Sequence, residues 1–343
     1  MTPCSEIVHG GSLEAAALAF PGAPQPFIDL STGINPVPYP YAPVPPAAYA
    51  RLPEPGALLA LQAAAARAYG MADPAMVVAA PGTQILISLL PLLLPQDSVA
   101  VLGPTYAEHA AAWRNGGARV VEVAGAAVLE GHAAVLCNPN NPDGRRLEPA
   151  AVLALAERVR LLVVDEAFAD LEDSVSVAPH VRPGMVVLRS FGKAYGLAGV
   201  RLGFALAEPA LAARLRRALG PWAVSGPALS IGMQALADAG WRAQAARRLR
   251  ADGARLDGLL RAAGGRIVGG TLLFRLVEHA EAAVLADRLG AHGVMVCRFA
   301  GRPPLLRLGL PAPPDWPRVS RALGGAGLVD APGPGAHTSG DVG

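Results

Sequence analysis

The sequence predicts an α/β fold with two domains, a large one built on a mainly parallel β-sheet and a smaller α+β domain. With 343 residues, 52% of them hydrophobic, the chain can bury a large core and is long enough for two domains. Short apolar runs alternate with helical stretches between residues 75 and 190, which is typical of a parallel sheet with helices on both faces. From about Gly226 the pattern shifts to a long Ala/Arg-rich helix followed by short strands.

The N-terminal segment, residues 1–46, is predicted to be an arm with little helix that joins the small domain. Six prolines between Asn35 and Pro46 hold that part extended, because each proline fixes its own φ and lacks a backbone donor. The other boundaries that we expect are 47–225 for the large domain, 226–330 for the small domain and 331–343 for a Pro/Gly-rich, disordered tail.

The elements follow from this pattern. A helix over Gly56–Tyr69 precedes the large sheet, whose strands each end in polar or glycine-containing residues, where such sheets carry their ligand groups. The strands predicted there are Ala75–Ala79, Ser98–Leu102, Arg119–Val123, Ala133–Cys137, Leu161–Val164 and Met185–Ser190. The small domain is predicted to contain helix Ile231–Ala263, strand Thr271–Val277, helix Ala280–His292 and strands Val294–Arg298 and Leu305–Leu310.

Composition excludes several classes of function. A net charge of +2 with 16% charged residues provides no basic stripe for nucleic acid. Cys4, Cys137 and Cys297 match neither a zinc spacing nor a disulfide framework, so we expect no metal and a reducing cytoplasm. The longest apolar run, Ile85–Leu94, is too short to span a bilayer, and no signal peptide is evident, so we expect no membrane partner.

Lys193 is the only lysine in the chain, and the other 28 basic residues are arginine. Arginine keeps its proton in proteins, whereas lysine can become a neutral, nucleophilic amine. Ser190 precedes Lys193 by three residues and Arg201 follows it by eight. A hydroxyl and a guanidinium flanking an amine suit a cofactor whose phosphate lies near its reactive carbon. The alternative is a lysine retained by chance, beside an ordinary turn and a surface arginine.

Four further residue groups fit the same kind of cofactor. Gly82-Thr83-Gln84 is predicted to open a helix, whose free N–H groups bind phosphate, although a plain loop is the alternative. Asp165 ends a strand and could pair with a protonated pyridine nitrogen, or simply cap a helix. Asn141 could hydrogen-bond a ring oxygen, or only form a turn. Tyr106 could stack on the ring, or only pack in the core.

The order of these features is specific. The chain resembles fold-type I pyridoxal-phosphate enzymes of the class I/II aminotransferase superfamily. The resemblance lies in a glycine turn, a tyrosine, Asn-Pro, a strand-terminal aspartate and then Ser-x-x-Lys with a following arginine. The histidinol-phosphate aminotransferase branch is the nearest broad match, and the resemblance covers roughly residues 5–325. It implies a large cofactor-binding domain with a seven-stranded type of sheet. It implies catalytic roles for Lys193, which holds the cofactor covalently, for Asp165 at the ring nitrogen and for Tyr106 on the ring face.

The resemblance also assigns binding residues. The residues implied to bind pyridoxal 5'-phosphate are Gly82, Thr83, Gln84, Tyr106, Asn141, Asp165, Ser190, Lys193 and Arg201. Arg307, in Leu305-Leu-Arg-Leu-Gly309, matches the arginine that binds the substrate carboxylate. Two family positions differ here. Leu52 stands where the aminotransferase branch has a tyrosine that reaches the neighbouring subunit, and Asp143 replaces a threonine of the Asn-Pro-Thr-Gly turn, which we expect to affect only turn geometry.

The arm sharpens the resemblance. His9-Gly-Gly-Ser12 and Asp29-Leu-Ser-Thr-Gly-Ile-Asn-Pro36 are similar to the opening of threonine-phosphate decarboxylases of cobalamin biosynthesis. Phe168 also favours the decarboxylases, because many aminotransferases of the branch have tyrosine there. The implied reaction is decarboxylation of L-threonine O-3-phosphate to (R)-1-amino-2-propanol O-2-phosphate. The alternatives are a histidinol-phosphate aminotransferase, or a non-catalytic protein that binds the cofactor.

Substrate-binding candidates come from the arm and the small domain. Arg298 precedes Arg307 by nine residues, and both are predicted at strand ends, so the two could divide a substrate phosphate and a carboxylate. The alternative for Arg298 is a surface ion pair. His9 and Asn35 are candidate substrate contacts, and a mobile N-terminus is the alternative for His9. We expect a homodimer with a phosphorylated amino acid as substrate.

Overall fold

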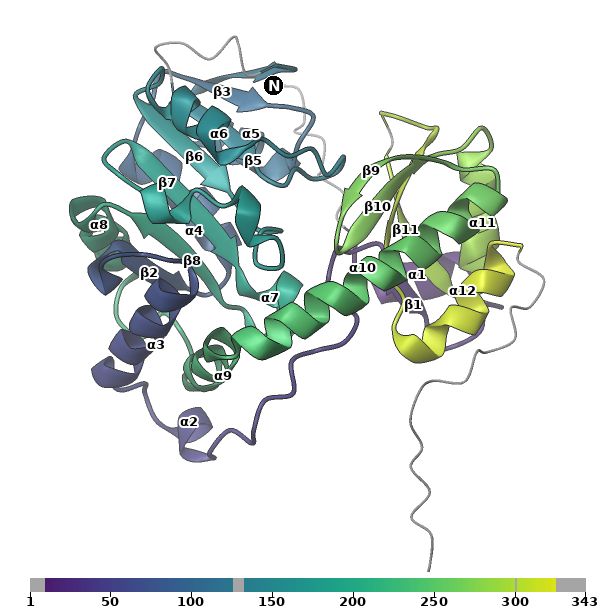
Figure 1. Ribbon diagram of the computed structural model, residues 1–343, viewed down its shortest axis with the longest axis horizontal. Coiled ribbons are helices and arrows are strands. Elements are labelled where there is room, and N and C mark those ends of the chain that lie inside the picture. The colour runs from purple at the N-terminus through teal and green to yellow at the C-terminus, as the bar shows by residue number, and fades with distance from the viewer. Residues whose placement is uncertain (1–9, 126–132, 300, 325–343) are drawn as a thin grey trace, which may run out of the picture.

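The computed structural model describes residues 10–125, 133–299 and 301–324. Within these ranges the strands form two β-sheets, one with seven strands and one with five. Figure 1 shows them in two lobes, with the long helix α10 (Ala239–Ala262) running from the larger lobe into the smaller one. None of the helices within these ranges is long and apolar enough to cross a membrane.

The large sheet has the strand order β2-β8-β7-β6-β5-β3-β4. β8 is antiparallel to both of its neighbours, and the pairs from β7 to β4 are parallel. Six of these strands fall where the sequence predicts them, but β8 was not expected. Its Gly203–Ala207 run contains only two large apolar residues beside glycine and alanine, so its β propensity is low. The bounds are β2 Val77–Ala80, β3 Ser98–Leu102, β4 Arg119–Val123, β5 Ala133–Cys137, β6 Leu161–Asp165, β7 Met185–Ser190 and β8 Gly203–Ala207.

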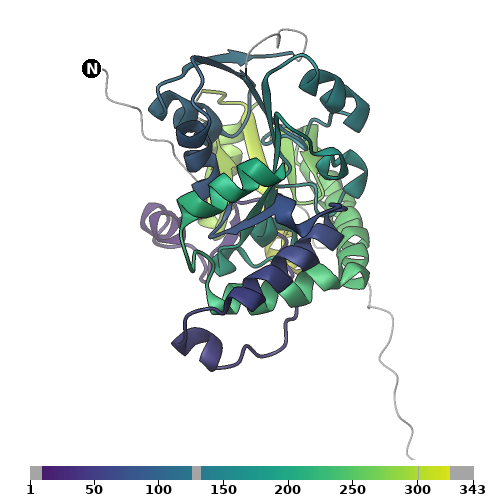
Figure 2. The same cartoon turned by 90° about the vertical axis from the view of Figure 1, so that its left-hand side faces the viewer.

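Helices cover both faces of this sheet, because successive strand residues point to opposite sides. Val164 packs in one hydrophobic cluster with Leu61 of α3, whereas Val163 packs in the other with Leu86 of α4. Figure 2 shows α3 and α8 on either side of the edge strand β2. One face carries α3 (Pro55–Ala68), α6 (Pro149–Ala156) and α9 (Gly226–Ala237), and the other α4 (Thr83–Leu93), α5 (Ala107–Asn115) and α8 (Pro209–Leu219).

The small sheet has the strand order β1-β11-β12-β10-β9, and its first strand comes from the N-terminal arm. β1 pairs in parallel with β11, so the arm is part of this sheet. The predicted strand over Thr271–Val277 is wrong in one respect, since the segment is a hairpin that turns at Leu272 and Leu273. The bounds are β1 Ile28–Leu30, β9 Arg266–Thr271, β10 Phe274–Glu278, β11 Val294–Arg298 and β12 Leu305–Gly309.

The described part of the arm has one short helix, and one helix prediction for the small domain needs correction. The arm contains α1 (Leu13–Ala19), which begins where the Ser12 side chain accepts a hydrogen bond from Ala15 N. The single helix expected over Ile231–Ala263 is two helices, because Asp238 ends α9 and its carboxylate accepts from Trp241 N at 2.8 Å, capping α10. The remaining helices are α2 Ala47–Ala50, α7 Phe191–Ala194, α11 Ala282–Ala291 and α12 Trp316–Ala322, with 3-10 turns at Pro74–Met76, Asp173–Val175, Ala178–His180, Ala198–Val200 and Pro313–Asp315.

A buried ion network lies on the α3 side of the large sheet. Arg189 donates to Glu166 Oε2 at 2.6 Å and lies 2.7 Å from Asp170 Oδ1. The three residues are at most 2% exposed, and the guanidinium lies 4.4 Å from the centre of the Tyr69 ring. Because strand side chains alternate, fixing Arg189 and Glu166 on this face directs the neighbouring Ser190 and Asp165 to the opposite one.

Replacing Arg189 with alanine is expected to lower the free energy of unfolding by about 3–5 kcal/mol, because two buried carboxylates lose their counter-charge. Arg182→Ala is a matched control, since Arg182 pairs with Glu157 at the surface and such pairs contribute about 0–1 kcal/mol. Urea unfolding of the two variants and the parent protein measures both effects. An equal loss of unfolding free energy in the two variants would show that the buried network stabilises the fold no more than a surface ion pair does.

Candidate active site

The functional candidates meet at one edge of the large sheet. β5, β6 and β7 run parallel, so their carboxyl ends lie side by side, and Cys137 is in register with Asp165. β2 runs in the same direction because it and β7 are each antiparallel to β8. The glycine turn after β2 therefore lies at the same edge as Asp165 and Ser190. The strand order thus brings together groups that are more than 100 residues apart in sequence.

Asp165 is a buried carboxylate with two fixed partners. Its Oδ1 accepts from Ala167 N at 2.9 Å, and its Oδ2 lies 2.8 Å from Nε2 of His109, a residue that is 1% exposed. Burial raises the pKa of Asp165, but His109 and the charge of Lys193 outweigh it, so the pKa lies below its usual value. Burial lowers the pKa of His109, yet Cys137 and Asp165 raise it to about 10 overall. The site therefore holds an ionised Asp165 carboxylate paired with the His109 imidazolium.

Lys193 lies on the short helix α7, directly after β7. Its Nζ donates to Ser190 Oγ at 3.3 Å and lies 5.2 Å from the centre of the Phe168 ring. Burial lowers the pKa of Lys193. The negative charge of Asp165 raises this pKa, the positive charge of Arg307 lowers it further, and the net shift is downward. A lowered pKa makes the neutral, nucleophilic amine more accessible near neutral pH.

The predicted glycine turn does begin a helix. Gly82 has φ of +86° and is the residue before α4. The positive φ disfavours any other residue there, and a Cβ would lie 2.6 Å from Nη2 of Arg201, so the guanidinium lies directly beside this glycine. A Cβ on Gly203 would likewise lie 2.6 Å from Thr83 N. Free N–H groups at the start of α4 and the Arg201 guanidinium therefore lie together, which makes this corner suitable for an anion.

Tyr106 and Gln84 contact each other beside this corner. The Tyr106 hydroxyl donates to Gln84 Oε1 at 3.3 Å, and Gln84 Nε2 donates to Glu108 Oε2 at 3.2 Å. Burial raises the pKa of Tyr106 to about 12, so the phenol stays protonated. His109 follows Tyr106 by three residues, and their rings pack edge to face with centres 6.0 Å apart. His109 was not among the residues predicted from sequence, although this one-turn spacing from Tyr106 was the available signal.

Arg307 joins the two lobes at the site. From β12 it donates through Nη1 to Asn141 Oδ1, on the loop after β5, and through Nη2 to Ser31 O at 2.7 Å, just after β1. Its guanidinium lies 5.4 Å from the centre of the Phe274 ring. Burial lowers the pKa of Arg307. Arg307, predicted to bind the substrate carboxylate, thus lies next to Asn141, predicted to bind the ring oxygen. Arg307 is on the side of the site that the small lobe provides.

This arrangement can be compared with known proteins. A family model described as "Aminotransferase class I and II" matches residues 47–325. The chain belongs to this family. The resemblance seen in the sequence is therefore confirmed.

Two relatives of this aminotransferase-family chain match nearly its whole length. Threonine-phosphate decarboxylase from a Sinorhizobium species is 45% identical over 313 residues, 89% of this chain and 93% of the relative. Threonine-phosphate decarboxylase from Pseudomonas aeruginosa is 42% identical over 326 residues, 92% of this chain and 96% of the relative. The structure of histidinol-phosphate aminotransferase from Sinorhizobium meliloti in complex with pyridoxal-5'-phosphate matches with a TM-score of 0.77 at 20% identity, covering 94% of this chain and 96% of that one, which confirms the fold class.

Asn35 of this family member lies against the backbone of the lysine helix. It is 2% exposed, and its Nδ2 donates to Ala194 O at 2.8 Å. Its Oδ1 accepts from Val37 N at 3.1 Å and from Arg248 Nη2 at 2.9 Å, and its own N–H donates to Lys193 O at 2.8 Å. Through these contacts Asn35 holds the arm against the lysine helix, and its contact with substrate stays a prediction.

Arg298 also needs correction. Cys297 is the residue opposite Arg307 in the β11–β12 pair, so Arg298 falls on the other face of the small sheet. There it forms an exposed ion pair with Asp287 of α11, whose carboxylate accepts at 2.6 Å. The predicted partnership of Arg298 with Arg307 is therefore absent, and the surface alternative is the one that the structure contains.

The other residues singled out by the sequence lie at several different places. His9 lies outside the described residues, as do Cys4 and the tail 331–343. Leu52 is 64% exposed. Phe168 is buried edge to face against Phe274, with ring centres 5.1 Å apart. Asp143 accepts from Asn140 Nδ2 at 2.7 Å, an interaction within its own turn.

Proposed function

We propose that this protein is a pyridoxal-phosphate-dependent decarboxylase that converts L-threonine O-3-phosphate to (R)-1-amino-2-propanol O-2-phosphate in cobalamin biosynthesis. The observation that carries the proposal is the identity of 45% and 42%, over nearly whole chains, with two proteins named threonine-phosphate decarboxylase. The convergence of Lys193, Asp165 and Arg307 at one edge of the sheet supports it, because these groups suit an amino-acid substrate bound through a carbonyl cofactor.

The residues present fit this cofactor. The start of α4, with the side chain of Arg201 over Gly82, offers donors for its phosphate. Asp165 is ionised and buried, as a partner for a protonated ring nitrogen must be. Lys193 is the only side-chain amine that the chain offers for covalent attachment. The fold-related histidinol-phosphate aminotransferase binds pyridoxal-5'-phosphate, which also supports the proposal.

Each residue then has a defined task. When bound, pyridoxal phosphate supplies an electron sink for the pair released as carbon dioxide leaves. Asp165 keeps the proton on the ring nitrogen. Arg307 holds the substrate carboxylate, and this fixes which bond at Cα is aligned for cleavage. The Lys193 amine, whose pKa burial lowers, returns a proton to Cα, while Phe168 and Phe274 make this side of the site apolar.

A direct assay tests the reaction. Incubation of the purified protein with threonine phosphate is expected to release carbon dioxide without any need for 2-oxoglutarate. Threonine itself should be a worse substrate by a factor on the order of 10⁴ in kcat/KM. Recognition of the phosphate is inferred from the names of the relatives, and a site that recognises it would leave its phosphate donors unpaired with threonine. Faster transamination of histidinol phosphate than decarboxylation of threonine phosphate would favour the alternative, a histidinol-phosphate aminotransferase.

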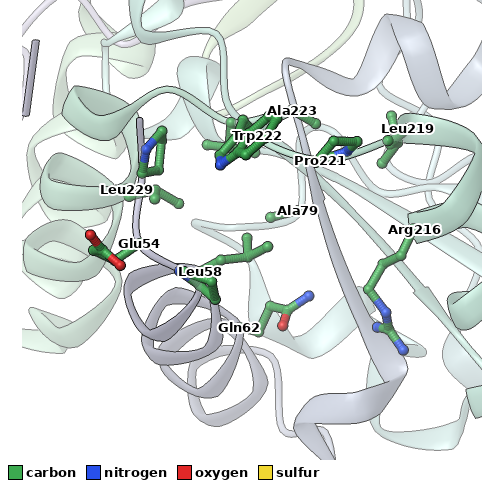
Figure 3. A pocket seen from close by; sticks show the side chains of 14 residues that line it. Glu54, Leu58, Gln62, Ala79, Arg216, Leu219, Pro221, Trp222, Ala223 and Leu229 are labelled. Carbon is green, nitrogen blue, oxygen red and sulfur yellow. The ribbon is translucent and has the colours of Figure 1, made fainter. Parts of the chain in front are cut away.

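The proposal includes a homodimer. Tyr49, Leu52 and Trp222 are exposed large apolar side chains on neighbouring segments of one end of the large lobe. Figure 3 shows a groove there, of about 310 Å³, between α3 and the segment after α8, with Leu58 and Trp222 on opposite sides. Several exposed large apolar side chains at one end of a domain are typical of an interaction site.

Light scattering of the purified protein is expected to give twice the mass of the 35.0 kDa chain. Trp222→Glu should shift the mass toward that of the monomer, whereas Val284→Glu, a change at another exposed apolar residue on α11, should not. A monomeric mass for the parent protein at a concentration at which it is fully active would contradict the proposal.

A further inference from the structure

A cysteine that the proposed reaction does not use lies beside the catalytic carboxylate. Cys137 ends β5 and is in register with Asp165 of β6, so both side chains project from the same face of the large sheet. α5 covers that face and places His109 over the pair. The ligand-type atoms of His109, Cys137 and Asp165 all lie within 4.8 Å of one another, and the residues are 1%, 8% and 5% exposed.

The chemistry of this trio is that of a metal centre. Thiolate, imidazole and carboxylate are the ligands that zinc takes in proteins, with bonds of roughly 2.0–2.3 Å. Such bonds in a tetrahedral arrangement separate ligand atoms by roughly 3.3–3.7 Å, so the trio needs only small side-chain rotations to enclose an ion. A thiolate and a carboxylate together balance a dication, which removes the main cost of burying it. On binding, the Cys137 thiol and the His109 ring each release a proton to solvent.

We propose that His109, Cys137 and Asp165 bind one thiophilic divalent cation of the zinc type in the cofactor-free protein, and that this cation and pyridoxal phosphate exclude one another. The exclusion rests on the proposed function, because it requires Asp165 to be the group that pairs with the cofactor's ring nitrogen. An ion bound to the Asp165 carboxylate would occupy the place of the ring nitrogen. The cation site itself depends only on the three side chains.

Cobalt titration of the cofactor-free protein tests the site, because Co²⁺ bound to a thiolate gives a charge-transfer band in the near ultraviolet. One equivalent is expected to produce the band. Cys137→Ser should abolish it, whereas Cys297→Ser and Cys4→Ser should leave it unchanged. Circular dichroism of each variant checks that the fold is intact, and calorimetric titration with Zn²⁺ should give one site that is lost in Cys137→Ser. Absence of the band, or its survival in Cys137→Ser, overturns the site.

Competition tests the second half. Added pyridoxal phosphate is expected to remove the cobalt band, and Co²⁺ bound first is expected to slow the appearance of the cofactor's own absorbance. A band that persists while the cofactor binds overturns the exclusion. Cofactor binding and carbon dioxide release in metal-free buffer are measured in parallel. Failure of those two measurements counts against the proposed function, while the cobalt results of the variants still decide the cation site.

Discussion

Lys193→Ala is expected to lose both the covalently held cofactor and all measurable turnover, because no second lysine can replace the amine. Borohydride treatment of the parent protein, which makes the covalent link permanent, followed by peptide mapping should place the label on Lys193 alone. The absorbance of the bound cofactor should change on adding substrate amine in the parent protein. A non-catalytic cofactor-binding protein would show no accompanying product.

A second lysine provides the matched control. Arg302 is exposed, so Arg302→Lys introduces an amine on the surface without touching the described site. Neither this variant nor the double variant Lys193→Ala/Arg302→Lys should carry label at residue 302. Label anywhere except Lys193 in the parent protein would rule out the assignment.

Asp165→Asn is expected to retain cofactor but to lower kcat by roughly 10²–10³-fold, the scale seen when one preorganised electrostatic group is removed. The amide keeps the shape of the side chain and can still accept from Ala167 N, but it no longer holds the ring nitrogen protonated. Stopped-flow single turnovers with threonine phosphate would separate this chemical step from product release.

Asp143→Asn serves as the control for this change, since Asp143 accepts bonds only within its turn among the contacts described and an amide oxygen can do the same. Its kcat should stay close to that of the parent protein. If Asp165→Asn behaves like Asp143→Asn, the Asp165 carboxylate acts only as the partner of His109 and Ala167.

The large sheet was readable from sequence because buried parallel strands are short, continuous apolar runs. Ser98–Leu102 and Ala133–Cys137 have the expected bounds for this reason. The same rule brought Asp165 and the Ser190–Lys193 pair together, since parallel strands share their carboxyl edge. β8 was not expected because three of its five residues are glycine or alanine, which are depleted in strands.

The less predictable residues depend on facts that only tertiary structure contains. Whether Arg298 faces the site is decided by its register with β12, and one step along a strand reverses the face. His109 matters because α5 lies over the end of β6, which spacing along the chain does not reveal. The buried amide oxygen of Asn35 accepts from Arg248 of α10, which is more than 200 residues away in sequence.

The arm has a mechanical consequence. Leu30 is hydrogen-bonded into the small sheet, and Asn35 N–H is bonded to the carbonyl of Lys193 in the large lobe. Only residues 31–34 separate these anchors, so a fully extended chain between them reaches about 17 Å at roughly 3.3–3.6 Å per residue. The arm is therefore a tether of fixed length. As long as both anchors hold, it limits how far the lobes can open, and wider opening must pull on the backbone of Lys193, the proposed catalytic residue.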